Sequence, residues 1–351
     1  MIESTEENNR MDVKKSYQIL VPIINKKIEL LTAFAILLLP VAVAFPFIVG
    51  DFFTGLLIQA LIFGIFAISV DILWGYAGIL SFGQAVFFGL GAYIAAKIMM
   101  AYPGGSADYF ALLLATIGPG MIALVIAGIL FYRGIKKDYF TIITLTLGII
   151  AGQIANTWSS VTGGYNGLVG VPSISIGVPF MWSVPLSGIL YYFAVLSLTI
   201  GVFMFTRRTV NSPFGRALMA INRNEQKARA LGYNVKKHKT LAFALAGAIG
   251  GFAGALYAGF FSFVDPSLLG FALSTQVLIW VLVGGRETLI GPVLGTVFLK
   301  FFESTVSGIF AFTWVLFVGF LLVIAVLALP KGLVEIYSRG IRRLDPNGKP
   351  L

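Results

Sequence analysis

The chain has 351 residues, of which 58% are hydrophobic and only 11% are charged. Soluble domains carry about 25% charged residues, so this composition excludes a soluble domain and predicts an all-α polytopic membrane protein. The sequence contains no Cys and one His, His238, which excludes disulfides and Cys or His metal sites within the membrane. It also lacks a G-x-x-x-x-G-K-[ST] phosphate-binding motif, and no catalytic cluster stands out, so we expect no cofactor, no metal and no enzyme activity.

The apolar runs predict about ten transmembrane or re-entrant helices, since a crossing needs about 20 apolar residues. They are Ile28–Val49, Phe52–Trp74, Ile79–Ala101, Phe110–Phe131, Tyr139–Ser160, Leu186–Thr206, Thr240–Phe263, Leu268–Gly285, Leu289–Glu303 and Val306–Leu329. The eighth and ninth are short, and an alternative is a hairpin that re-enters from outside and leaves Arg286 and Glu287 buried among helices. The first could be a cleaved signal peptide, because Ala42-Val43-Ala44 fits a cleavage site. Its apolar run continues past that site, and we expect a retained span.

Positive charge is concentrated in four clusters. All but three of the 25 Lys and Arg lie in Met1–Lys27, Arg133–Lys137, Arg207–Lys239 and Lys331–Leu351. With the predicted spans, all four fall on one side of the membrane, which the positive-inside tendency identifies as the cytoplasm. We expect a cytoplasmic N-terminal tail (1–27), a transmembrane domain (28–329) with a cytoplasmic loop (207–239), and a cytoplasmic C-terminal tail (330–351), in the inner membrane. The net charge of +10 then favours anionic membrane lipid and not nucleic acid.

The loop 207–239 contains a segment, Ser212–Asn234, that we expect to be helical. Small and apolar residues recur near helical spacing at Ala217, Ala220, Ile221, Ala228 and Leu231. A short amphipathic helix held at the cytoplasmic face is a surface that a motor protein could push. The alternative is a charged connection between spans that has no partner.

Polar side chains inside the spans are candidates for a solute path, because such residues are costly in lipid and commonly functional. We single out Gln84, Gln153, Asn156 and Gln276. Gln153 and Asn156 lie one helical turn apart and share a face of their predicted helix. Lys300 and Glu303 are three residues apart and can pair. Hydrogen bonding between helices is the alternative role of each candidate.

Glycine marks two further features. Gly250, Gly254 and Ala258 recur at four-residue spacing, which predicts helices that pack closely in lipid. The longest outer connection, Val161–Pro185, contains several Gly and Pro, and we expect a shaped surface loop there instead of a folded domain.

Five ordered sequence blocks carry a family resemblance. They are Gly75–Tyr93, Tyr139–Leu145, Thr162–Pro172, Gly215–Gly232 and Val283–Gly295. Together they resemble the permease subunits of branched-chain amino-acid ABC importers, and most closely the longer of the two permease types in such systems. The resemblance extends over Phe52–Gly332, which is most of the chain.

This resemblance implies an importer that works by alternating access. Its partners would be a second permease subunit in a heterodimer, two cytoplasmic ABC ATPase subunits and an extracytoplasmic solute-binding protein. The resemblance assigns coupling to the ATPase to Gly215, Arg216, Ala217, Glu225, Ala228 and Gly232. It assigns the outer loop that faces the binding protein to Gly163, Gly164, Asn166 and Gly167.

Two departures and two other classes of function define the alternatives. Glu225 stands one residue earlier than the Glu of the general coupling motif of ABC importers. Trp280–Arg286 resembles the related urea-importer permeases, so urea or a short amide is the alternative solute. A secondary transporter or channel without an ATPase would need coupling-ion ligands or a charged relay in the spans, and a membrane enzyme would need a catalytic cluster. Neither stands out in the sequence.

Overall fold

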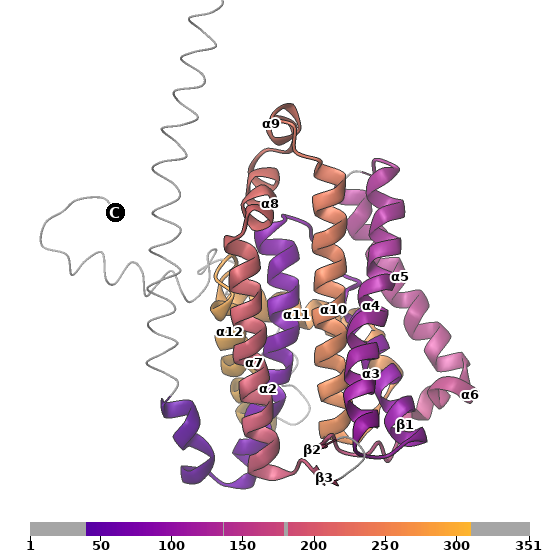
Figure 1. Ribbon diagram of the computed structural model, residues 1–351, viewed down its shortest axis with the longest axis vertical. Helices are drawn as coiled ribbons and strands as arrows, with labels where there is room; N and C mark the ends of the chain where they lie inside the picture. Colours follow the sequence, from indigo (N-terminus) through magenta and orange to yellow (C-terminus); the bar gives the residue numbers. More distant parts are fainter. Residues whose placement is uncertain (1–39, 136, 179–181, 310–351) are drawn as a thin grey trace, which may run out of the picture.

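The structure, a computed structural model, describes residues 40–135, 137–178 and 182–309. These residues form a bundle of helices that run between two ends of the molecule (Figure 1). Residues 40–48 are helical. The helices that follow are α2 (Asp51–Asp71), η1 (Ile72–Tyr76), α3 (Gln84–Ala101), α4 (Ser106–Tyr132), α5 (Lys137–Thr157), α6 (Ser159–Thr162), η2 (Gly164–Asn166), α7 (Gly188–Asn211), α8 (Pro213–Arg223), α9 (Glu225–Ala230), α10 (Val235–Phe261), η3 (Pro266–Leu269), α11 (Phe271–Gly284) and α12 (Ile290–Ile309). The strands are β1 (Leu168–Val169), β2 (Ser175–Val178), β3 (Trp182–Pro185) and β4 (Phe263–Val264).

Within the described residues, six helices are long and apolar enough to cross a membrane. They are α2 with its η1 extension, α3, α4, α5 from Tyr139 onward, α7 and α10. This result confirms an all-α polytopic membrane protein. The first and last predicted spans, Ile28–Val49 and Val306–Leu329, lie largely outside the described residues.

One predicted span, Ile79–Ala101, begins too early. Helix α3 starts only at Gln84, and Ile79–Gly83 are not helical. The cause is Gly78, whose left-handed φ of +67° ends the preceding helix. The chain therefore crosses part of the bundle in a non-helical conformation before α3 begins.

The last two described helices form a hairpin that differs from the prediction at both ends. Helix α11 begins at Phe271, after the η3 turn, and α12 continues without a break through the expected gap after Glu303. Leu269 contacts Gly89, so α11 begins inside the bundle. Arg286 and Glu287 are both exposed in the described part of the chain, which contradicts their expected burial in the re-entrant alternative; the re-entry itself stays a prediction.

Helix α10 packs along α3 and α4 in the centre of the bundle. A Cβ at Gly91 would overlap the backbone of Gly251, and a Cβ at Gly254 would overlap the backbone at Phe88. Ala258 is also fully buried. These contacts confirm the close helix packing that the small residues predicted, since helices in lipid associate mainly through close van der Waals contact.

The two ends of the bundle carry different structures. Figure 1 shows α8 and α9 at one end, and α6 with β1, β2 and β3 at the other. Strand β1 pairs with β4, and β2 pairs with β3, both antiparallel. The buried carboxylate of Asp108 accepts a hydrogen bond from the Ser175 N–H at 2.8 Å, which fastens β2 to the start of α4. The loop 207–239 and the loop Val161–Pro185 thus lie at opposite ends.

Candidate functional site

The segment Ser212–Asn234 forms two helices, where one was expected. Ser212 caps α8, its hydroxyl accepting from the Gly215 N–H at 3.5 Å. Asn224 then adopts an extended conformation and caps α9, its Oδ1 accepting from the Lys227 N–H at 2.9 Å. Because an Asn side chain competes with the backbone in this way, it starts a new helix instead of continuing the old one. Asn234 caps α10 by the same contact with the Lys237 N–H.

Three of the predicted coupling residues are buried within the chain. A Cβ at Gly215 would overlap the backbone of Val210, so glycine permits the tight turn from α7 into α8. Ala217 faces the interior, and Ala228 is buried in a cluster with Ile221 and Val235. These three positions pack within the described part of the chain, and their contact with an ATPase stays a prediction.

The side chains that a partner could reach are mostly basic. Those exposed on α8 and α9 include Arg216, Arg223, Lys227 and Arg229. Glu225 is half-buried and binds Arg229 at 3.1 Å and Lys239 of α10 at 2.6 Å. Exposed ion pairs contribute little to stability, but the pair of Glu225 with Lys239 connects α9 to α10. Gly232 is exposed, with a left-handed φ of +87°, and it allows the turn after α9.

The four predicted path residues are not brought together. Gln84 is fully buried, and within the described residues its amide nitrogen and oxygen have no hydrogen-bond partner. Gln276 is half-buried on α11. Gln153 and Asn156 are exposed on α5 in the described part of the chain.

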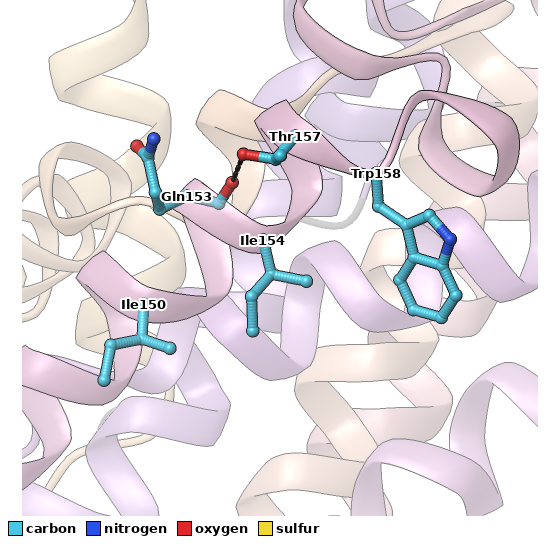
Figure 2. A pocket seen from close by; sticks show the side chains of 5 residues that line it. All are labelled: Ile150, Gln153, Ile154, Thr157 and Trp158. Atoms are coloured by element: carbon cyan, nitrogen blue, oxygen red, sulfur yellow. Dashed lines mark hydrogen bonds between the residues drawn. The ribbon is translucent and has the colours of Figure 1, made fainter.

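Gln153 lies in a shallow groove along α5 (Figure 2). The groove has a volume of about 540 Å³ and is lined by Ile150, Gln153, Ile154, Thr157 and Trp158. The Thr157 hydroxyl donates to the backbone carbonyl of Gln153 at 2.9 Å, so this hydrogen bond does not involve the Gln153 side-chain amide (Figure 2). The groove is formed by α5 and Trp158, the residue that follows it, and the other described residues leave it open.

The predicted outer loop is a tight glycine turn at the end opposite α8 and α9. Gly163, Gly164 and Gly167 all have left-handed φ values, between +62° and +77°. A Cβ at Gly163 would overlap the Gly167 carbonyl, so this turn needs glycine at position 163. The turn presents Tyr165, which is 87% exposed, and Asn166 at the surface.

The sequence comparison decides the family. Residues 52–327 match the family described as "Branched-chain amino acid transport system / permease component". The chain belongs to this permease family.

Relatives of the permease agree with this assignment. It is 28% identical to the high-affinity branched-chain amino acid transport system permease protein LivM of Salmonella typhimurium, over 86% of this chain and 75% of that protein. It is also 28% identical to the probable branched-chain amino acid transport permease protein LivM of Methanocaldococcus jannaschii, over 66% of this chain and 74% of that one. It is 28% identical to the autoinducer 2 import system permease protein LsrC of Yersinia pseudotuberculosis, over half of each chain. No solved structure matches the permease.

Two outward faces of the permease differ in polarity. The exposed face of α4 is entirely apolar or aromatic: Tyr109, Phe110, Leu113, Ile117, Met121, Ile122, Val125, Ile129 and Tyr132. The exposed face of α5 mixes Ile142, Ile149 and Ile150 with polar Thr146, Gln153, Asn156 and Thr157. Lipid tails offer no hydrogen bonds to an exposed amide. The α4 face therefore suits lipid, whereas the α5 face suits a protein or a water-lined path.

The sequence analysis missed Asn222, which joins α8 to the transmembrane helices, and Asp71, which lies next to that contact. The Asn222 side-chain amide donates to the Gly75 carbonyl at 2.7 Å. Asp71, which was assigned no role, lies beside Gly75 and is fully buried. The available signal was the glycine pair Gly75 and Gly78, because such residues mark close approaches of backbone as well as turns.

Proposed function

We propose that this permease is the membrane subunit of an ATP-driven importer that moves branched-chain amino acids inward. Its relatives include permeases of branched-chain amino acid transport systems. The observation that carries the proposal is the pair α8–α9, which three caps hold at one end of the bundle with Arg216, Arg223 and Lys227 outward. The sequence has no Walker A motif, so the energy of ATP would have to come from separate ATPase subunits that contact this pair.

The orientation follows from charge. The basic residues of loop 207–239 lie at the same end as Arg133, since Lys236 at the start of α10 contacts the Tyr132 carbonyl at 3.3 Å. We assign this end to the cytoplasm, together with the tails 1–27 and 330–351, and the bilayer to the inner membrane. The turn at Gly163–Gly167 then faces outward and receives the solute-binding protein.

The second permease subunit covers the mixed face of α5 in this proposal. A heterodimer assembled there would enclose the groove at Gln153 and place Asn156 beside it. Neutral amides lining a water-filled path can bind the polar part of a small solute, and neighbouring isoleucines can bind an apolar side chain. ATP binding would then shift the assembly between outward-open and inward-open states, through its different affinity for the two.

The test is uptake by the reconstituted system. The permease is co-expressed with its second permease and ATPase subunits, purified through a tag on this chain, and placed in liposomes with the binding protein. The proposal expects the ATPase to co-purify and leucine, isoleucine and valine to enter only when ATP is present on the ATPase side. Uptake without ATPase, driven by an ion gradient or running only downhill, would establish the secondary transporter or channel instead.

Competition identifies the solute. Urea, a short amide and autoinducer 2 are added separately in excess over labelled leucine. Branched-chain transport expects labelled leucine to enter and none of them to compete, whereas the urea alternative expects little leucine uptake and ATP-dependent entry of labelled urea. Inhibition by autoinducer 2 would assign the permease to the cargo named for its LsrC relative.

A further inference from the structure

A buried carboxylate joins α2 to the loop of the α11–α12 hairpin. Asp71 is fully buried, and one carboxylate oxygen accepts from the Glu287 N–H at 2.9 Å. The other accepts from the Leu289 N–H at 3.1 Å. These two hydrogen bonds join residues that lie 216 and 218 positions apart in the sequence.

The loop that Asp71 holds is conformationally strained. Glu287 and Leu289 have φ values of +62° and +58°, which residues other than glycine rarely adopt. Such residues persist only where the surroundings enforce them, and they are concentrated at sites that move or bind. The Leu289 side chain is buried with Ile68, Tyr76 and Val210. The loop is thus fixed by two hydrogen bonds to one carboxylate and by one apolar anchor.

The same carboxylate adjoins the contact made by α8. Asp71 is followed by the π-helical turn η1, and such turns occur frequently at functional sites. A Cβ at Gly75 would overlap the Asp71 carboxylate, and the Gly75 carbonyl accepts the hydrogen bond from Asn222 of α8. Gly75 therefore touches α8 on one side and Asp71 on the other.

We propose that Asp71 is a positioning residue that transmits displacement of α8 to the α11–α12 hairpin. The route runs from Asn222 through the η1 turn to Asp71, and from there to Glu287 and Leu289. When the ATPase moves α8, the carboxylate carries the hairpin loop with it. This inference rests on the proposed function, because it needs an ATPase that acts on α8.

The experiment measures the ATP hydrolysed per solute imported in the reconstituted complete transporter. In Asp71→Asn the side chain keeps its shape, but an NH2 group replaces one of the two oxygens that accept from the Glu287 and Leu289 N–H groups. We expect the complex to assemble and hydrolyse ATP while this ratio rises about three-fold or more, within the range of measured coupling effects. The matched control is Asp108→Asn, another buried and hydrogen-bonded carboxylate at the opposite end, which should leave the ratio unchanged.

A second substitution separates transmission from stability. Glu287→Gly removes the backbone strain at a residue whose side chain is exposed. It should therefore restore the thermal stability of Asp71→Asn without restoring the wild-type ratio of ATP hydrolysed to solute imported. If the glycine restores the ratio as well, Asp71 only holds the loop and the inference is overturned. A wild-type ratio in Asp71→Asn overturns it directly.

Asn222→Ala tests the other side of the route. If Asp71→Asn fails to assemble, Asn222→Ala alone should raise the ratio, and a normal ratio there overturns the inference. Where both variants assemble, their effects on the ratio should be non-additive in the double variant. The two contacts lie on the same route, so breaking either one already interrupts it. Failure of the proposed function is distinguishable, because the wild-type complex would then show no ATP-dependent uptake at all.

Discussion

The Asn222 side chain reaches across the end of the bundle and donates to the Gly75 carbonyl at 2.7 Å, joining residues 147 positions apart in sequence. This contact is possible only because Gly78 leaves room for it: a Cβ at Gly78 would overlap the Asn222 oxygen. Helix α8 is therefore attached to the end of α2 as well as to α7. Helix α8 thus contacts the membrane domain through a hydrogen bond as well as through the chain.

Gly78→Ala should weaken this attachment. The substitution adds a Cβ that overlaps Asn222 and also places an alanine at φ +67°. Gly134→Ala is the matched control, since Gly134 has φ +76° but nothing within 4 Å of its Cβ position. The left-handed conformation alone costs roughly 1–2 kcal/mol, and the overlap adds to it. In detergent, Gly78→Ala should lower the midpoint of thermal unfolding clearly more than Gly134→Ala, and equal shifts would contradict the contact.

Ala228→Glu should detach α9. Ala228 is 2% exposed and packs against Ile221 and Val235, and an unpaired buried charge destabilises a fold strongly. We expect the variant to insert but to lose most of its co-purifying ATPase. Ala230→Glu adds the same charge at an exposed position of the same helix and should leave unfolding unchanged. Normal unfolding and normal ATPase binding in Ala228→Glu would show that the α9 packing does not support the interface.

Asn156→Leu should reduce uptake with little change in assembly or thermal stability. Asn156 is exposed in the described part of the permease, so replacing it should change the stability of the chain little. A polar contact in a membrane protein contributes about 0.6 kcal/mol on average, which corresponds to a roughly three-fold loss of uptake. Ile149→Leu, at an apolar position of the same face, is the control. Wild-type uptake by Asn156→Leu would assign the residue a structural role, and failed assembly would place it in the subunit interface.

Single cysteines in this Cys-free chain should report the orientation. Asn224→Cys between α8 and α9 should react with a membrane-impermeant maleimide only from the cytoplasmic side. Tyr165→Cys in the glycine turn at the opposite end should react only from outside. Ser4→Cys and Asn347→Cys, which lie outside the described residues, extend the test to both tails and should behave as Asn224→Cys does. Labelling of Asn224→Cys in intact cells would overturn the ATPase-contact proposal together with the topology.

The amino-acid sequence by itself determined the class of protein and much of its local structure. Apolar runs of membrane length predicted α2, α4, α7 and α10, because the cost of exposing backbone and polar groups to lipid depends on each segment alone. The helical segment between α7 and α10 was also predicted from a local pattern, the spacing of its small and apolar residues. Asn224 divides this segment into two helices. The family resemblance also depended only on ordered local blocks.

The tertiary structure alone decided which side each residue faces and which distant residues meet. Ala228 and Gln153 both sit on predicted helices, yet one is buried within the chain and the other is exposed. The two hydrogen bonds of Asp71 reach residues more than 200 positions away. Helix propensity and hydropathy act along the chain, whereas burial and these contacts depend on which helices pack together in space. The spacing of small residues predicted close helix packing, but which helices meet is a property of the whole bundle.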